Sequence, residues 1–199
     1  MAVTHKFVDW EQCHRLCLEL YKKVTESGYQ SDVIVGMGRG GWVPARIFAD
    51  MFTSQQIANV KVEFYNGIYS TSKRPRITQP ASSDLQGKKV LLIDDISDTG
   101  RSMMTVVEHL KHQKVADLRT VTLHVKPWTK LRPDFYGELT KAWIVYPWDL
   151  KEFIFAFANQ LSEKHVPLLE IEKQLKKIGL PTQLTREFFQ QWQSTQHAN

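Results

Sequence analysis

Two adjacent carboxylic acids, Asp94 and Asp95, follow an apolar run of strand length at residues 90–93. Three positions further along stands the segment DTGRS at residues 98–102, which combines a third acid with hydroxyl, glycine and arginine residues. Carboxylates bind sugar hydroxyls or a hard cation such as Mg2+. Backbone N–H groups beside small residues suit an anion instead. The spacing therefore places polyol and phosphate recognition side by side at the end of one strand.

The residues after this turn keep the period of a helix. The apolar positions Met103, Val106, Val107 and Leu110 fall at i, i+3, i+4 and i+7. A turn that opens a helix presents unpaired N–H groups and the positive end of the helix dipole, and both favour a phosphate. The small residues that would let an anion approach are Ser97, Thr99, Gly100 and Ser102. Each piece alone is also common at strand ends and helix caps, but all of them in this order favour a binding site.

A second glycine-rich turn comes earlier in the chain. The apolar run at residues 32–36 leads into Met37, Gly38, Arg39, Gly40 and Gly41, after which residues 42–51 have the pattern of a helix. Glycines permit backbone conformations that wrap an anion, and Arg39 adds positive charge. The alternative is a plain strand-to-helix turn that binds nothing.

The segment IDDISDTGRS resembles the signature with which type I phosphoribosyltransferases bind 5-phosphoribosyl-1-pyrophosphate (PRPP). The resemblance implies that Asp94 and Asp95 hold the ribose hydroxyls, directly or through Mg2+. The residues implied to cradle the 5'-phosphate are Asp98, Thr99, Gly100, Arg101 and Ser102, although the compared enzymes often carry glycine in place of Arg101. Those implied to hold the leaving pyrophosphate are Gly38, Arg39, Gly40 and Gly41. The family commonly has a cis peptide in this loop, which here would join Gly38 to Arg39.

A narrower resemblance lies in the second half of the chain. The segments HVKP and AWIVYPWD are similar to segments of bacterial xanthine-guanine phosphoribosyltransferases, so the resemblance extends over about residues 32–149. It implies that Lys126 donates to the purine O6, that Trp143 stacks on the base, and that the backbone of Ile144 meets the base edge. Asp149 would be a second metal or amine contact, and Asp98 could accept the N7 proton of the purine as a catalytic group. Trp143 could equally be a core residue.

Residues 66–88 break the pattern of strands and helices. They contain cations, prolines, glycines and several hydroxyl residues, which is the composition of a long mobile loop or ribbon. A plain linker is the simplest interpretation. In the resembled family a flexible hood folds over the reaction centre here, and its tip would comprise Tyr69, Ser70, Lys73 and Arg74.

The remaining pattern predicts an α/β fold with a mainly parallel sheet flanked by helices. Strands are expected to begin near residues 32, 58, 89, 118 and 142, and an amphipathic helix is expected over residues 8–26. We expect a phosphoribosyltransferase domain over residues 1–149 and three helices over 150–199. The helices could be a packing or oligomerisation extension or a helix-turn-helix DNA reader, although four glutamates dilute any basic face.

Composition sets broader limits. The 199 residues carry a formal charge of +5, which suits either a polyanion or a small ligand with several phosphate charges. Cys13 and Cys17 lie four residues apart on a predicted helix, and we expect buried thiols there rather than a metal site. Because no stretch resembles a secretion signal or a membrane span, we expect a cytoplasmic protein without a membrane partner.

These observations support two hypotheses. The first is an enzyme of purine salvage that uses PRPP and Mg2+ to convert hypoxanthine, guanine or xanthine to the nucleoside monophosphate. Such an enzyme would not bind nucleic acid and would form a homodimer or homotetramer. The second is a regulatory protein of the same fold that senses PRPP and binds nucleic acid. The presence of Lys126, Trp143 and Asp98 favours the enzyme, because sensor members of the superfamily often lack a complete base pocket.

Overall fold

The computed structural model describes residues 4–52, 56–66 and 73–196, and the chain divides into two compact units. The larger unit is Glu11–Lys141, and the smaller comprises Met1–Trp10 and Ala142–Asn199. The expected boundary at residue 149 thus falls inside the smaller unit rather than between the two. None of the helices that the structure describes has the length and apolar character needed to cross a bilayer.

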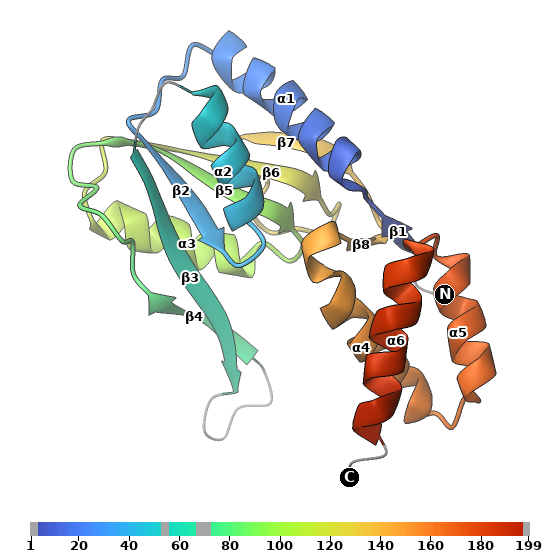
Figure 1. The fold of residues 1–199 in the computed structure, drawn as a ribbon. Coiled ribbons are helices and arrows are strands. Elements are labelled where there is room, and N and C mark those ends of the chain that lie inside the picture. Colours follow the sequence, from blue (N-terminus) through green and yellow to red (C-terminus); the bar gives the residue numbers. More distant parts are fainter. Residues whose placement is uncertain (1–3, 53–55, 67–72, 197–199) are drawn as a thin grey trace. The chain divides into compact units, whose positions relative to one another are not determined.

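The larger unit is built on a six-stranded sheet in the order β4-β3-β2-β5-β6-β7 (Figure 1). Its strands are β2 (Val33–Gly38), β3 (Gln56–Asn66), β4 (Lys73–Gln79), β5 (Lys89–Ser97), β6 (Asp117–Val125) and β7 (Phe135–Leu139). All neighbouring pairs are parallel except β3 and β4. The central strands β2 and β5 are buried almost throughout, as both faces of a parallel sheet are covered by helices. This confirms the predicted α/β fold with a mainly parallel sheet.

Helices cover both faces of this sheet (Figure 1). On one face, α3 (Arg101–His112) packs Met103, Val106 and Leu110 into a core with strands β2, β3 and β5, which confirms the helical period predicted there. On the other face lie α1 (Trp10–Glu26) and α2 (Trp42–Met51). The two cysteines of α1 are buried free thiols, as expected. This arrangement brings the turns before α2 and α3 to the carboxyl ends of adjacent strands.

Within its described residues, the smaller unit holds three α-helices, one short 3-10 helix and a two-stranded sheet. β1 (His5–Phe7) pairs in parallel with β8 (Trp143–Val145), and the chain continues through the short helix η1 (Pro147–Asp149). The three predicted helices are confirmed as α4 (Leu150–Ser162), α5 (Leu168–Lys177) and α6 (Thr182–Gln196). They share an apolar core in which Trp192 donates its indole N–H to Asn159 Oδ1 at 2.7 Å.

One strand assignment from the sequence was wrong. The strand predicted near residue 142 does not join the central sheet; it is β8, and the edge position beside β6 belongs to β7. From its sequence, the segment of β7 was interpreted as a polar connection. The segment contains no apolar run, since Gly137 and Glu138 interrupt it, and in the structure most of its side chains are half-buried. Gly137 is needed there, since a Cβ would press on the Leu123 carbonyl and lie 3.1 Å from Leu16.

The segment at residues 66–88, expected to be a long mobile loop or a ribbon, is described at residue 66 and from residue 73 onward. Residues 73–79 form β4, which runs antiparallel to β3, so the ribbon form is the correct one for this part. Pro75 is tolerated because β4 is an edge strand and needs fewer ladder hydrogen bonds. Further on, Leu85 is fully buried in the core, which fixes the approach to β5.

Candidate functional site

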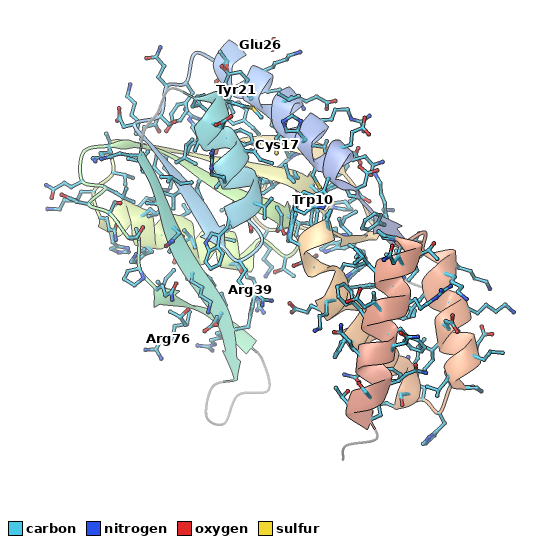
Figure 2. All side chains as sticks on the ribbon, viewed as in Figure 1. Trp10, Cys17, Tyr21, Glu26, Arg39 and Arg76 are labelled. Carbon is cyan, nitrogen blue, oxygen red and sulfur yellow. The ribbon has the colours of Figure 1, made fainter. Side chains whose placement is uncertain are left out.

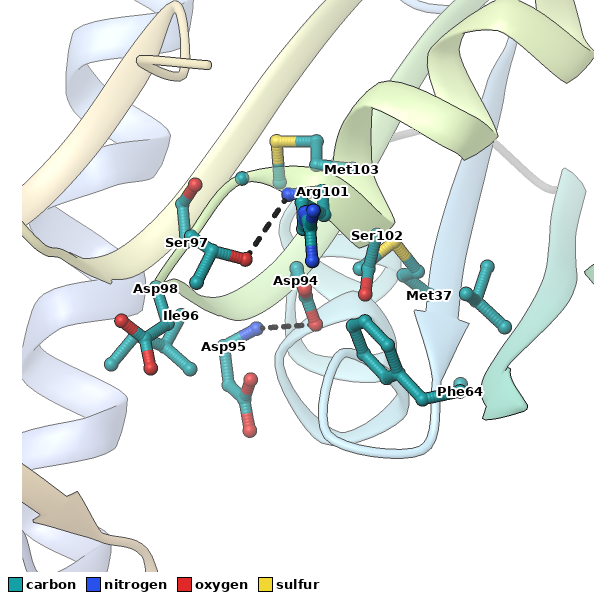
Figure 3. A pocket seen from close by; sticks show the side chains of 14 residues that line it. Met37, Phe64, Asp94, Asp95, Ile96, Ser97, Asp98, Arg101, Ser102 and Met103 are labelled. Atoms are coloured by element: carbon teal, nitrogen blue, oxygen red, sulfur yellow. Dashed lines mark hydrogen bonds between the residues drawn. The ribbon is translucent and has the colours of Figure 1, made fainter. Parts of the chain in front are cut away.

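A cavity of about 470 Å³ lies at the carboxyl ends of β2, β3 and β5, beside the first turn of α3 (Figure 3). The predicted site residues that line it are Gly38, Asp94, Asp95, Asp98, Thr99, Gly100, Arg101 and Ser102. Ser97, expected from the sequence to let an anion approach, also lines it. The rest of the lining was not assigned to the site from the sequence and consists of Met37, Val62, Phe64, Ile96 and Met103. The structure therefore brings the two acids, the DTGRS turn and the start of the glycine-rich turn together around one space.

The two acids are nearly buried although they line the cavity. Asp94 is 8% exposed and Asp95 is 6% exposed, and the Asp95 N–H donates to Asp94 Oδ1 at 3.0 Å. A Cβ at Gly40 would overlap the carboxylate of Asp95, so only glycine lets this acid lie against the turn after β2. The acids at the end of β5 and the glycine-rich turn thus form one surface.

The turn after β5 has the conformation expected of an anion-binding helix start. Gly100 occupies the N-cap of α3 with φ +76°, a left-handed conformation that favours glycine. Glycine has no side chain that could accept hydrogen bonds from the first N–H groups of the helix. The Arg101 N–H has only a long contact of 3.4 Å to Thr99 Oγ1. These donors and the positive end of the helix dipole can therefore serve an anion in the cavity.

This turn is held by the chain that follows β6, which we call the 126–131 segment. The Lys126 N–H donates to Ser97 O at 3.0 Å, and the Lys130 N–H donates to Thr99 O at 3.1 Å. Ser97 Oγ lies 2.9 Å from Thr129 Oγ1 and donates to Leu131 O at 3.1 Å. Side-chain and backbone hydrogen bonds together hold the turn at residues 98–102 in place.

Sequence reasoning missed Trp128, the residue of this segment that reaches a predicted catalytic group. Its indole N–H donates to Asp98 Oδ1 at 2.8 Å. Lys126 Nζ lies 5.6 Å from the centroid of the same ring. Burial lowers the pKa of the Lys126 ammonium, and the negative charge of Asp98 acts in the opposite direction. The only available signal was the position of Trp128 just after a strand end that carries Lys126.

The turn after β2 is shaped differently. The peptide between Gly38 and Arg39 is cis, as the resemblance implied. The Gly41 N–H donates to Met37 O at 2.9 Å, and the Trp42 N–H donates to Arg39 O at 3.1 Å. A Cβ at Gly41 would lie 2.7 Å from Met37 O and 2.9 Å from Asp94 Cα. Arg39 projects from this turn with an exposed side chain (Figure 2).

Three residues predicted to meet the base belong to the smaller unit. Trp143 and Ile144 belong to β8 and Asp149 to η1, all within the smaller unit. Trp143 is 54% exposed, so it is not the core residue that was the alternative interpretation.

Of the expected hood tip, only part can be placed. Tyr69 and Ser70 lie outside the described residues. Lys73 begins β4, and Arg74 follows it in that strand with an exposed side chain. Arg74 belongs to the pairing partner of β3, which contributes Val62 and Phe64 to the cavity.

The acids suit a magnesium ion that shares its coordination with a ligand. Among the described residues, no group of three or more His, Cys, Asp or Glu side chains is arranged to hold a metal by itself. Asp94 and Asp95 nevertheless offer neighbouring carboxylates at the cavity wall. Mg2+ in proteins is often bound by one or two carboxylates and completed by phosphate oxygens and water. The residues present fit that mode.

Comparisons with known proteins show which family the chain resembles. A sequence model described as the phosphoribosyl transferase domain matches residues 4–152. A xanthine-guanine phosphoribosyltransferase of Idiomarina loihiensis is 30% identical over 161 residues, which cover 78% of this chain and 94% of that protein. The enzyme of the same name from Gluconobacter oxydans is 30% identical over 150 residues, covering 74% and 86%.

Solved structures give the same result. The crystal structure of a purine phosphoribosyltransferase from Pyrococcus horikoshii is similar with a TM-score of 0.66 and 34% identity, covering 72% of this chain and 93% of that one. A xanthine-guanine-hypoxanthine phosphoribosyltransferase of Helicobacter pylori, with a TM-score of 0.64 and 20% identity, shares the fold over 75% of this chain and 97% of its own.

Proposed function

Because this chain belongs to the phosphoribosyl transferase domain family, we propose that it transfers the 5-phosphoribosyl group of PRPP to a 6-oxopurine base. The base would be hypoxanthine, guanine or xanthine, and the products the nucleoside 5'-monophosphate and pyrophosphate. Such a reaction recovers free bases as nucleotides, which is purine salvage.

The observation that carries the proposal is the cavity with two carboxylates set between two phosphate-type turns. PRPP has a phosphate at one end, a pyrophosphate at the other and sugar hydroxyls between them. The turn at residues 98–102 would bind the 5'-phosphate, and residues 38–41 would bind the pyrophosphate. Asp94 and Asp95 would meet the ribose hydroxyls, because charge-assisted hydrogen bonds to carboxylates are among the stronger ones.

The proposed reaction requires no covalent bond between the protein and the substrate. The purine N9 forms a bond to C1 of the ribose while the bond from C1 to the pyrophosphate oxygen breaks. Positive charge develops on the ribose ring as pyrophosphate leaves, so fixed carboxylates beside the sugar stabilise the transition state. Asp98 would accept the proton that the purine loses from N7. Holding both reactants in register supplies much of the remaining acceleration.

Mg2+ is the cofactor that we propose for this site. When bound, it neutralises charge on the pyrophosphate and so makes that group easier to expel. Asp94 and Asp95 are the residues that would hold it, together with oxygens of PRPP. Removal of the ion with a chelator should therefore stop transfer, while circular dichroism of the protein stays unchanged.

The base would be recognised by donors and an aromatic face. Lys126 would donate to O6, and Trp143 would stack on the ring with Ile144 and Asp149 at the edge. The role of Trp143 is supported by its exposure, which leaves the ring accessible to a base. A site built around one hydrogen bond rejects an analogue that leaves its polar group unpaired. Adenine carries an amino group at that position and should therefore be a poor substrate.

We further propose that the β3–β4 hairpin covers the reacting centre. Phe64 of β3 lines the cavity and pairs with Pro75, so the exposed Arg74 next to it in β4 could reach the pyrophosphate. Cover would keep water from the developing oxocarbenium centre. Substitution of Arg74→Gln should then lower the transfer rate more than the affinity for PRPP.

A cytoplasmic homodimer or homotetramer is the assembly that we propose. Leu168, Leu169 and Leu184 are exposed on α5 and α6 and would be covered in such an assembly. Sedimentation equilibrium of the purified protein would decide between a monomer and an oligomer.

The direct test of the function is a panel of acceptor bases. The protein would be incubated with PRPP, Mg2+ and each of hypoxanthine, guanine, xanthine, adenine, orotate and uracil, and pyrophosphate release followed. We expect release with one or more 6-oxopurines and little with the other three bases. Tight PRPP binding without release from any base would refute the enzyme and support the regulatory alternative.

A further inference from the structure

Trp128 is a half-exposed aromatic residue with polar partners at both its edge and its face. It is 53% exposed, whereas Lys126, two residues earlier, is only 4% exposed. Burial of apolar surface therefore does not explain why the indole lies where it does. Its position is defined by the bond from its N–H to Asp98 Oδ1 and by the Lys126 ammonium near its ring.

The contact with Asp98 fixes the orientation of a carboxylate. Oδ1 of Asp98 accepts the indole N–H at 2.8 Å, which restrains rotation of the carboxylate plane and leaves Oδ2 for another partner. The half-buried side chain of Asp98 projects from a turn, where a restraint of this kind matters more than on a strand.

The contact with Lys126 places a donor. A Lys ammonium within about 6 Å of an indole centroid is attracted to the ring face. Lys126 lies within that range, and its backbone N–H is also held by Ser97 O. The backbone of Lys126 is thus held by the end of β5, and its ammonium lies near the ring of Trp128.

We infer that Trp128 is a positioning residue that sets the spacing between Asp98 and Lys126, and that this spacing is matched to N7 and O6 of a 6-oxopurine. The inference rests on the proposed function, because it takes its ligand from it. N7 and O6 lie on the same edge of the purine. N7 requires a proton acceptor, and O6 requires a hydrogen-bond donor. The rigid indole of Trp128 contacts both groups. It therefore holds the Asp98 carboxylate, the acceptor, and the Lys126 ammonium, the donor, in a fixed relation to each other.

Two substitutions distinguish the contribution of the indole N–H from that of the aromatic ring. Trp128→Phe keeps an aromatic face for Lys126 but removes the donor to Asp98. We expect kcat/KM for guanine to fall by about three- to tenfold, the usual size for one lost hydrogen bond, with the KM for PRPP unchanged. Trp128→Ala removes both contacts and should also lower the preference for guanine over adenine.

The chain offers a matched control. Trp192→Phe also removes an indole N–H bonded to a side-chain oxygen, that of Asn159, but within the core of the C-terminal helices. It should lower the melting temperature and leave kcat/KM for guanine unchanged. An equal loss of PRPP affinity and of kcat/KM in Trp128→Phe would show a merely structural role for Trp128 and overturn the inference.

A spectroscopic measurement tests the hydrogen bond without activity. In protein labelled with 15N-tryptophan, the indole resonance absent from Trp128→Phe belongs to Trp128. That resonance should move in Asp98→Ala, while the resonance lost in Trp192→Phe stays in place. No movement of the Trp128 signal would overturn the inference.

The outcomes also distinguish a failure of this inference from a failure of the proposed function. Wild-type protein that releases no pyrophosphate with any base would overturn the proposed function and this inference with it. Wild-type transfer that Trp128→Phe leaves unchanged would overturn the inference alone.

Discussion

The turns after β2 and β5 of the larger unit reach similar positions by different means. The turn after β2 depends on absent side chains, since a Cβ at Gly40 would overlap Asp95 and one at Gly41 would crowd Met37 O and Asp94. The turn after β5 also needs a glycine, at position 100, but it depends in addition on side chains that are present, since Ser97 and the 126–131 segment hold it by hydrogen bonds. The first turn is thus fixed by close approach of backbone, and the second by a polar support.

This difference predicts which kind of substitution destabilises each turn. A turn defined by close packing has no room for added atoms, so small-to-large changes should damage it most. A turn defined by hydrogen bonds should suffer when a donor or acceptor is removed. Asp95 belongs to β5 and lies against the turn after β2, so its loss should affect ligand binding more than a change in either turn alone.

The largest expected effect follows from Asp95→Asn. The variant keeps the volume of the side chain but removes its negative charge, and the loss of one charged hydrogen bond costs about 1.5 to 3 kcal/mol. PRPP affinity should therefore fall by about tenfold to 100-fold in calorimetry with Mg2+. Asp94→Asn should act similarly. The matched control is Asp50→Asn, which removes an exposed charge that faces Arg46 in α2 and should leave affinity unchanged. Wild-type affinity in both site variants would remove the acids from the site.

Gly41→Ala tests the turn that depends on close packing. The added methyl group would meet backbone atoms of β2 and β5 that have little freedom to move. Overpacking of this kind costs about 1 to 3 kcal/mol in the free energy of unfolding. Urea denaturation measures that loss directly. A variant as stable as the wild type would show that the turn is looser than the structure indicates.

Ser97→Ala tests the turn that depends on hydrogen bonds. The buried hydroxyl bonds to Thr129 Oγ1 and Leu131 O, and its removal should lower the free energy of unfolding by about 1 kcal/mol. Ser194→Ala is the control, because its hydroxyl bonds to Gln191 O at the exposed end of α6. A loss no greater than that of the control would mean that the 126–131 segment does not support the turn through Ser97.

The smallest effect concerns the charge of Lys126. Burial lowers the pKa of this ammonium below its ordinary value of 10.5, so the unfolded chain retains the proton to higher pH than the folded chain. The contribution of Lys126 to the free energy of unfolding should then rise with pH through the interval just below 10.5. Lys126→Met removes this rise. Its stability relative to the wild type should be greatest near neutral pH and decline toward pH 10.5, and a difference independent of pH would contradict the buried charge.

Much of the larger unit could be predicted from the sequence because its buried strands are continuous apolar runs. β2, β5, α2 and α3 and the turns between them follow from local pattern. β7 did not, because its half-buried residues form no apolar run. β8 was predicted as a strand, but its partner was not, because β1 lies far away in sequence. The pairing of β8 with β1 depends on a three-residue segment at the start of the chain.

The candidate site was predictable to a similar extent. Asp94, Asp95 and residues 98–102 line the cavity, since a strand and a helix start fix them by local geometry. Trp128 was missed because its role arises from a contact thirty residues away in the chain. The cavity wall from β3, with Val62 and Phe64, was also missed, because alternating strand residues give no sign of which face meets a ligand.

One calorimetric experiment tests most directly whether the two turns hold opposite ends of one ligand. Arg39→Gln and Arg101→Gln remove one exposed cation from each turn, and Arg46→Gln removes one from the outer side of α2 as a control. Each variant would be titrated with Mg2+-pyrophosphate and, separately, with ribose 5-phosphate. We predict that Arg39→Gln weakens only pyrophosphate and Arg101→Gln only ribose 5-phosphate, each by about tenfold, the usual size for one lost charged hydrogen bond. Equal weakening of both ligands by each variant would contradict the assignment of the two turns.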